Sequence, residues 1–185
     1  MPTILTHPAV PLAVGLGLGA GVIPVRLLIA GVIVSILPDL DVVAFHLGFP
    51  YAHDLGHRGA THSLLFAAII ALLGSMAISY FKASISRTFS FLLLAAASHG
   101  LLDAFTNGGL GIALFWPFSS VRYFAPAQVI EVSPLSMSRI FSARMGEVLM
   151  SELLWVWLPC LLLMLLLIFA RRSIKRSRLI TKNNY

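Results

Sequence analysis

The chain has 185 residues, of which 58% are hydrophobic and 11% are charged, whereas an ordinary soluble domain carries roughly 25% charged residues. This composition excludes an ordinary soluble enzyme and predicts one membrane domain. The formal net charge is +6, but nearly half of the basic residues follow a single apolar run near the C-terminus. That placement indicates a membrane anchor, so we expect the lipid bilayer as a partner and no nucleic acid.

Five apolar segments follow one another and predict an all-α fold, a polytopic membrane helix bundle of about five apolar helices. They are residues 8–23, 25–37, 63–81, 88–105 and 148–170. The last three are long enough to cross a hydrocarbon core of ~30 Å at ~1.5 Å per residue. The first two are short, and they predict either tilted spans or a re-entrant hairpin. Cys160, the single cysteine, lies in the last segment and excludes a thiolate metal site.

The distribution of basic residues predicts the orientation. If all five segments cross, nine basic residues lie on one side and four on the other, and the positive-inside rule places the nine in the cytoplasm. We therefore expect the N-terminus outside, a membrane-embedded domain over residues 1–170 and a basic cytoplasmic tail over 171–185. The nine are Arg26, Lys82, Arg87 and six residues of the tail, and the four are Arg58, Arg122, Arg139 and Arg144.

Histidine and aspartate side chains gather in short polar clusters between these segments, and the predicted orientation puts all of them on the outer side. Ionisable groups are costly in or beside a bilayer, and neutral imidazole with carboxylate is the usual ligand set for zinc and similar ions. We therefore predict a site for one or two divalent metal ions, with zinc favoured by the four imidazoles. The candidate ligands are His7, Asp39, Asp41, His57, His62, His99 and Asp103.

Each cluster also has a simpler interpretation. His99 and Asp103 lie four residues apart, so a helix places both on one face, where they either bind metal or form an interhelical hydrogen-bonding pair. His57 and His62 bracket a glycine-containing turn, in which Thr61 or His62 is expected to cap the third helix. Both histidines are equally compatible with a loop at the water interface.

Other polar residues receive weaker assignments. Asp39 and Asp41 are also compatible with a solvated turn, and Arg58 is expected to orient a carboxylate, bind an anionic substrate or contact a lipid headgroup. Residues 107–146 form a long, aromatic-rich connection, which predicts either a lid over the metal site or an interfacial aromatic belt. Three loop residues, His46, His53 and Asp54, are expected at the surface. Three carboxylates are expected to have no nearby partner, namely Glu131, Glu147 and Glu152.

Four motifs in this order resemble the YdjM-like family of membrane-bound predicted metal-dependent hydrolases: Pro38-Asp39-Leu40-Asp41, Gly56-His57-Arg58-Gly59-Ala60-Thr61-His62-Ser63, Ser98-His99-Gly100-Leu101-Leu102-Asp103 and Trp116-Pro117. The resemblance covers most of the chain and implies a LexA-regulated protein of a bacterial inner membrane. It implies metal roles for His7, Asp39, His57, His62, His99 and Asp103. The family is similar to zinc-dependent phospholipase C and P1-type nucleases, which carry two His-x-x-x-Asp motifs where this chain has one, so one or two metals are expected.

The leading functional hypothesis is a membrane-bound, metal-dependent hydrolase that cleaves a phosphoester or ester of an amphiphilic or lipid substrate at the outer membrane face. Asp39 or Asp41 is expected to act as general base, and Arg58 to neutralise the substrate. The alternative is a non-enzymatic membrane protein that binds or transports a metal. Polar groups in the cytoplasmic half are nearly absent from the sequence, which favours the enzyme over the transporter.

Overall fold

The computed structural model describes residues 1–133 and 143–183, and the regular structure within these ranges is helical, with two isolated β-bridges in the long connection after residue 105. The longer helices are α1 (Ala9–Leu18), α2 (Val25–Ile36), α4 (Leu64–Ser75), α6 (Ile85–Ala104), α7 (Ala143–Glu152) and α8 (Leu158–Asn183). Short elements connect them: η1 (Leu37–Val42), α3 (Val43–His46), η2 (Ala60–His62), α5 (Ile78–Phe81) and the π-turn η4 (Leu153–Trp157). The prediction of an all-α fold is confirmed.

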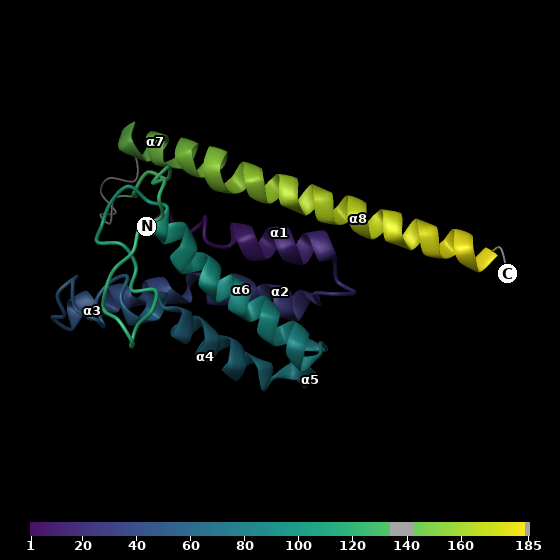
Figure 1. The fold of residues 1–185 in the computed structure, drawn as a ribbon, viewed down its shortest axis with the longest axis horizontal. Helices are drawn as coiled ribbons and strands as arrows, with labels where there is room; N and C mark the ends of the chain where they lie inside the picture. Colours follow the sequence, from purple (N-terminus) through teal and green to yellow (C-terminus); the bar gives the residue numbers. More distant parts are fainter. Residues whose placement is uncertain (134–142, 184–185) are drawn as a thin grey trace.

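The helices run back and forth along the long axis of the molecule (Figure 1). Helix α1 packs along α8, whereas α2 and α4 pack on α6. The ligand end, where the N-terminus lies, joins the residues before α1, η1, η2 and the C-terminal turn of α6. The basic end joins the turn after α1, the turn between α5 and α6, and the second half of α8. There Arg26 donates a hydrogen bond to the Tyr80 carbonyl, at 3.3 Å.

Two helices of the described chain are long and apolar enough to cross a membrane, Ile85–Ala104 and the continuous helix from Ala143 through Ser177. The expectation that the third apolar segment forms an equally long helix is wrong. Helix α4 has 12 residues and ends at Ser75, which is ~18 Å. The Ser75 hydroxyl donates to the Ala71 carbonyl at 2.7 Å, and the chain reverses through α5 and Lys82, which has a left-handed backbone. A bundle of five spanning helices is therefore not established by helix length.

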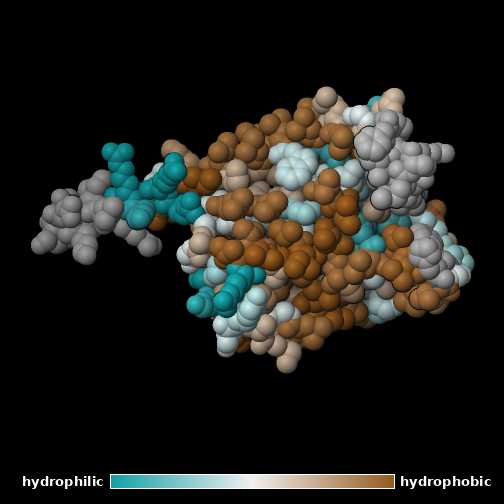
Figure 2. Space-filling model, turned by 180° about the vertical axis from the view of Figure 1, so that it is seen from behind, coloured by the Kyte–Doolittle hydropathy of each residue, from teal (hydrophilic) through white to brown (hydrophobic). Residues whose placement is uncertain are grey.

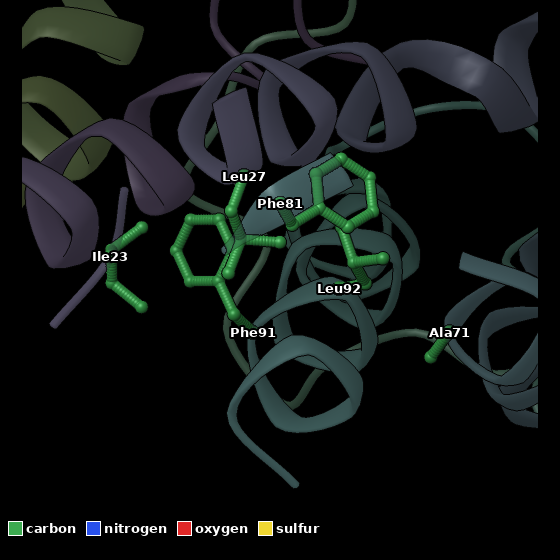
Figure 3. Packing of buried hydrophobic residues seen from close by; sticks show 6 residues of the cluster. All are labelled: Ile23, Leu27, Ala71, Phe81, Phe91 and Leu92. Atoms are coloured by element: carbon green, nitrogen blue, oxygen red, sulfur yellow. The ribbon is translucent and has the colours of Figure 1, made fainter. Parts of the chain in front are cut away.

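A hydrophobic cluster joins α2, α4 and α6 between the ligand end and the basic end. Figure 3 shows Leu27 of α2 facing Phe91 of α6. Small residues permit the close packing, because a Cβ on Gly31 would lie 2.4 Å from the Phe91 ring. The cluster comprises Ile23, Leu27, Ala71, Phe81, Phe91 and Leu92. Outside it, an apolar surface occupies the middle of the molecule, with hydrophilic side chains near the end where α8 extends beyond the bundle (Figure 2).

Candidate metal centre

Four chain segments bring the polar clusters together at the ligand end. His7 directly precedes α1, Asp39 lies in η1, His62 in η2, and His99 and Asp103 in the last turns of α6. The face shared by His99 and Asp103 is confirmed, since both side chains are fully buried on α6. A close approach makes this possible: a Cβ at position 100 would lie 2.8 Å from the His62 carbonyl oxygen. Glycine therefore allows η2 to pack directly against the helix that carries two of the candidate ligands.

One atom from each of Asp39, His62, His99 and Asp103 falls within 4.8 Å of the others, which is close enough to surround a single metal ion. Asp103 Oδ2 lies 3.1 Å from His62 Nε2, and Asp39 Oδ1 lies 3.4 Å from His99 Nε2. The two Nε2 atoms are 3.0 Å apart. All four residues are buried, and Asp39 keeps the largest exposed fraction, 6%.

The contacts of Nδ1 in His99 and His62 determine which nitrogen of each ring carries the lone pair. His99 Nδ1 lies 2.7 Å from the Ser35 carbonyl, which can only accept, so this nitrogen carries the hydrogen. His62 Nδ1 lies 3.0 Å from the Thr61 hydroxyl oxygen and 3.3 Å from Asp41 Oδ2. The Thr61 hydroxyl donates its own hydrogen to Asp41, so both neighbours can only accept from the ring and Nδ1 carries the hydrogen. In the neutral rings both Nε2 lone pairs therefore face each other. A positive charge, either a proton or a metal ion, is needed between them.

Unsatisfied buried atoms mark the same place. Eight buried side-chain atoms in the described chain lack a hydrogen-bond partner of acceptable geometry, and seven belong to this cluster: both ring nitrogens of His7, both carboxylate oxygens of Asp39 and of Asp103, and Arg58 Nε. Burying carboxylates and imidazoles without partners is costly. The donor set of two or three imidazoles and two carboxylates fits zinc or a similar divalent ion.

His7 adds a third imidazole to the cluster. Its ring stacks on His99 with centroids 3.7 Å apart, and its Nε2 lies 3.6 Å from Asp39 Oδ2. Burial lowers the pKa of His7 to about 3, so the ring is neutral at pH 7 and offers a lone pair. In His62 the carboxylates of Asp103 and Asp41 overcome the opposing effect of burial and raise its pKa to about 9. The centre thus attracts a cation.

Asp41 lies outside this inner group. Asp41 Oδ1 lies 2.7 Å from His57 Nδ1. Asp41 Oδ2 accepts hydrogen bonds from the Arg58 amide at 3.1 Å and from the Thr61 hydroxyl at 2.8 Å. Burial favours the neutral acid, but His57 and His62 hold the pKa of Asp41 well below its usual range. Asp41, His57 and His62 also lie close enough together to hold an ion. Protein donors already occupy both oxygens of Asp41, in contrast to those of Asp39.

Arg58 is fully buried and contacts the carboxylate of Asp103, with Nε 3.2 Å from Oδ2. Its terminal nitrogens donate to the Gly108 carbonyl at 2.7 Å and the Thr106 hydroxyl at 2.8 Å. Its backbone is left-handed, with a φ of 63°, which is uncommon for a residue other than glycine and is typical of functional sites. Of the three roles expected for Arg58, the contacts match the orientation of a carboxylate.

The long connection after α6 packs on the segment that carries His57 and Arg58. Arg122 donates to the His57 carbonyl at 2.9 Å and to the His53 carbonyl at 3.0 Å, and the Ala113 amide donates to the Arg58 carbonyl at 3.0 Å. The side chain of Phe118, by contrast, is 89% exposed. The connection therefore supports the site and also presents an aromatic ring outward. Residues 134–142 of the expected lid lie outside the described residues.

Four assignments from the sequence are wrong. Glu152 is buried and accepts hydrogen bonds from the Thr3 amide and from the Thr3 and Thr6 hydroxyls, both at 2.7 Å. Glu131 and Glu147 both pair with Arg144. The cap of α4 is Ser63, which accepts from the Phe66 amide at 3.1 Å, because Thr61 is bonded to Asp41. The sequence could have indicated that Glu152 has partners, because Glu152 stands among Leu, Met and Trp residues, where a buried ionised side chain needs hydrogen bonds. His53 is exposed, as expected, whereas the side chain of His46 lies outside the part of the chain that the structure describes.

Comparisons with known proteins identify the family of the chain. The model of the YdjM inner membrane protein family matches residues 1–175. The inner membrane protein YbcI of Escherichia coli (strain K12) is 50% identical over 173 residues, which is 93% of this chain and 100% of YbcI. No solved structure matches the chain. The chain therefore belongs to the YdjM family of inner membrane proteins.

Proposed function

We propose that the protein is a membrane-bound, metal-dependent hydrolase whose metal site is formed by Asp39, His62, His99 and Asp103. The observation that carries the proposal is the set of buried lone pairs without hydrogen-bond partners, which converge on one point. A divalent metal held there supplies a Lewis acid and lowers the pKa of water toward ~7. We favour one ion, because the oxygens of Asp41 already accept protein hydrogen bonds.

The chain's own residues then have distinct roles. Arg58 orients Asp103, and Asp41 holds the hydrogen on His62 Nδ1 so that Nε2 faces the metal, as outer partners of metal ligands commonly do. Asp39, the most exposed of the four, directs Oδ2 toward His7. We assign to Asp39 the acceptance of a proton from the attacking water, and we place His7 beside it as a further ligand or hydrogen-bonding partner.

An amphiphilic ester or phosphoester is the substrate class that the surroundings support. An apolar groove of ≈ 550 Å³ follows α6 to the ligand end and is closed there by the connection after α6. The groove follows the exposed face of α6, where Leu94 and Leu101 line it, whereas His99 and Asp103 lie on the buried face. An acyl chain in this groove would place a headgroup linkage at the end of α6 that carries the ligands, and the linkage would reach the metal around the end of that helix.

The burial of all four ligands favours a second candidate, a metal bound without catalysis, because structural sites are closed whereas catalytic sites keep an open position. Metal transport has weaker support. The hydrophobic cluster containing Leu27, Phe91 and Leu92 lies between the ligand end and the basic end. Within the described chain, α2 and α4 carry no carboxylate or imidazole there, and neither does α6 before His99. A measurement of substrate turnover distinguishes the hydrolase from a protein that binds metal without catalysis.

Metal content followed by a turnover screen tests the proposal. We expect the detergent-purified protein to hold about one divalent ion, and the His62→Ala/His99→Ala double variant to lose it, whereas His53→Ala, a change at an exposed histidine, should retain it. Full occupancy in the double variant would refute the site. Metal-loaded protein that hydrolyses no phospholipid, isoprenoid phosphate or simple ester would refute the enzyme and leave the non-catalytic metal protein.

We also propose the orientation, with the ligand end on the outer face and the C-terminus in the cytoplasm. The support is the gathering of Arg26, Lys82, Arg87 and the cations of α8 toward the basic end, which the positive-inside rule assigns to the cytoplasm. Reporter fusions to the C-terminus should be active only as cytoplasmic reporters. Activity of a periplasmic reporter at that position would reverse the assignment.

A further inference from the structure

A second groove lies at the basic end, far from the metal centre. It measures ≈ 400 Å³ and runs between the end of α1 and the second half of α8. Its walls are apolar, formed by Leu18, Val22, Leu167 and Ile174, and its lining also includes the exposed cations Arg171 and Lys175. An apolar cleft with cationic side chains along it has the chemical character of a site for an anionic amphiphile.

The groove exists because its two helices differ in length. Helix α1 ends at Leu18, after 10 residues, which is ~15 Å, whereas α8 continues beside the vacated space. Arg171 is held across the turn after α1: a Cβ on Gly19, whose φ is 78°, would lie 1.5 Å from the Arg171 guanidinium. The cation therefore lies over the C-terminal end of α1, and the space beyond α1 must be filled within the bilayer.

Arg171 and Lys175 also lack an acidic partner. Among the described residues no carboxylate lies within ion-pair distance of either side chain. Glu152, the nearest acid along the same continuous helix, lies 19 residues before Arg171, about 28 Å away at ~1.5 Å per residue. The other acidic side chains lie in the ligand-end segments or at the start of α7. Within the described residues, these two exposed cations therefore have no carboxylate to pair with and are available to an anionic ligand.

We propose that this groove binds one anionic glycerophospholipid. An acyl chain lies along Leu18, Val22 and Leu167, and the headgroup phosphate lies between Arg171 and Lys175, where guanidinium and ammonium donate charge-assisted hydrogen bonds. The site is independent of the metal centre and would exist whether or not the protein is an enzyme. It differs from a general basic surface because it requires both the cations and the apolar space.

Native mass spectrometry of the full chain in detergent tests this proposal with phosphatidylglycerol and phosphatidylethanolamine of identical acyl chains. We expect a preference of about 30-fold for the anionic lipid, because each of two cations near the headgroup contributes about fivefold. The double variant Arg171→Gln/Lys175→Gln should reduce the preference to nearly unity. Val22→Trp, which fills the groove and keeps every charge, should weaken retention of the anionic lipid about tenfold.

The matched control is Arg172→Gln/Arg176→Gln, which removes the same charge from exposed positions of α8 that do not line the groove. This variant should keep most of the preference. Equal losses in the two double variants, or an unaffected Val22→Trp, would overturn the proposal in favour of diffuse surface attraction. Equally tight binding of the same headgroup without acyl chains would overturn it in favour of a simple anion site.

Discussion

The Asp41→Asn variant tests whether Asp41 orients a metal ligand or binds a metal ion itself. The substitution preserves size but removes the charge that holds the hydrogen on His62 Nδ1, 3.3 Å from Asp41 Oδ2. A hydrogen bond to a charged group is worth about 1.5–3 kcal/mol, and changes to the outer partners of metal ligands typically cost about 10–100-fold in affinity. We therefore expect the metal affinity of Asp41→Asn to fall about 10–100-fold, which corresponds to about 1.4–2.7 kcal/mol.

Asp39→Asn should cost more, because Asp39 has no protein donor on either oxygen and is a proposed direct ligand. Competition titration against a chelator measures both affinities, and metal analysis at saturation measures the stoichiometry. Asp54→Asn is the matched control, since its carboxylate accepts a hydrogen bond from the Ser120 hydroxyl at 3.1 Å and lies outside both groups of candidate ligands. If Asp41→Asn lowers the saturating stoichiometry by one ion, Asp41, His57 and His62 bind a second metal and the reasoning fails.

Three further predictions follow from the same contacts. Carboxylates raise the pKa of His62 to about 9 against the effect of burial, so metal must displace a proton below that pH. Affinity should rise about tenfold per pH unit toward pH 9 and level off above it, and calorimetry in two buffers should detect about one released proton at pH 7. Gly100→Ala should lower metal affinity more than tenfold by pushing η2 away, whereas Gly146→Ala, with open space around it, should not. Glu152→Leu removes the acceptor of the Thr3 amide and of the Thr3 and Thr6 hydroxyls, which should cost about 1–3 kcal/mol of stability in chemical denaturation. A Glu152→Leu variant as stable as the wild type would contradict that assignment.

The gathering of the polar clusters at one end could be predicted from the sequence, because successive apolar segments reverse direction and every cluster lies at the same kind of helix end. The pairing of His99 with Asp103 followed from helical spacing alone. The different environments of Asp39 and Asp41 could not be predicted. Their identical side chains lie two residues apart, and only the fold determines that one meets His57, Thr61 and a backbone amide while the other meets imidazole lone pairs.

Other features depended on contacts that sequence patterns do not encode. The end of α4 at Ser75 interrupts an apolar run that hydropathy alone reads as continuous, because a serine hydroxyl bonded to a backbone carbonyl is invisible to hydropathy. Glu152 acquires partners only through residues near the other end of the chain. Arg58 is charged and yet fully buried, because its terminal nitrogens donate to Gly108 and Thr106 and its Nε lies beside the carboxylate of Asp103.

The bond between Glu152 and Thr6 joins residues 146 positions apart and therefore has a consequence for biosynthesis. The residues that precede His7 are translated first, but the bonds of Thr3 and Thr6 to Glu152 cannot form until Glu152 itself has been made. At about 5–20 residues per second, this interval lasts roughly 7–30 s. During that time, any ion captured by the nascent protein is held without the third imidazole in its final position. The third imidazole of the proposed metal centre therefore reaches its final position only after the C-terminal helix has been made, and truncation before Glu152 would remove the side-chain bonds that join the N-terminal residues to that helix.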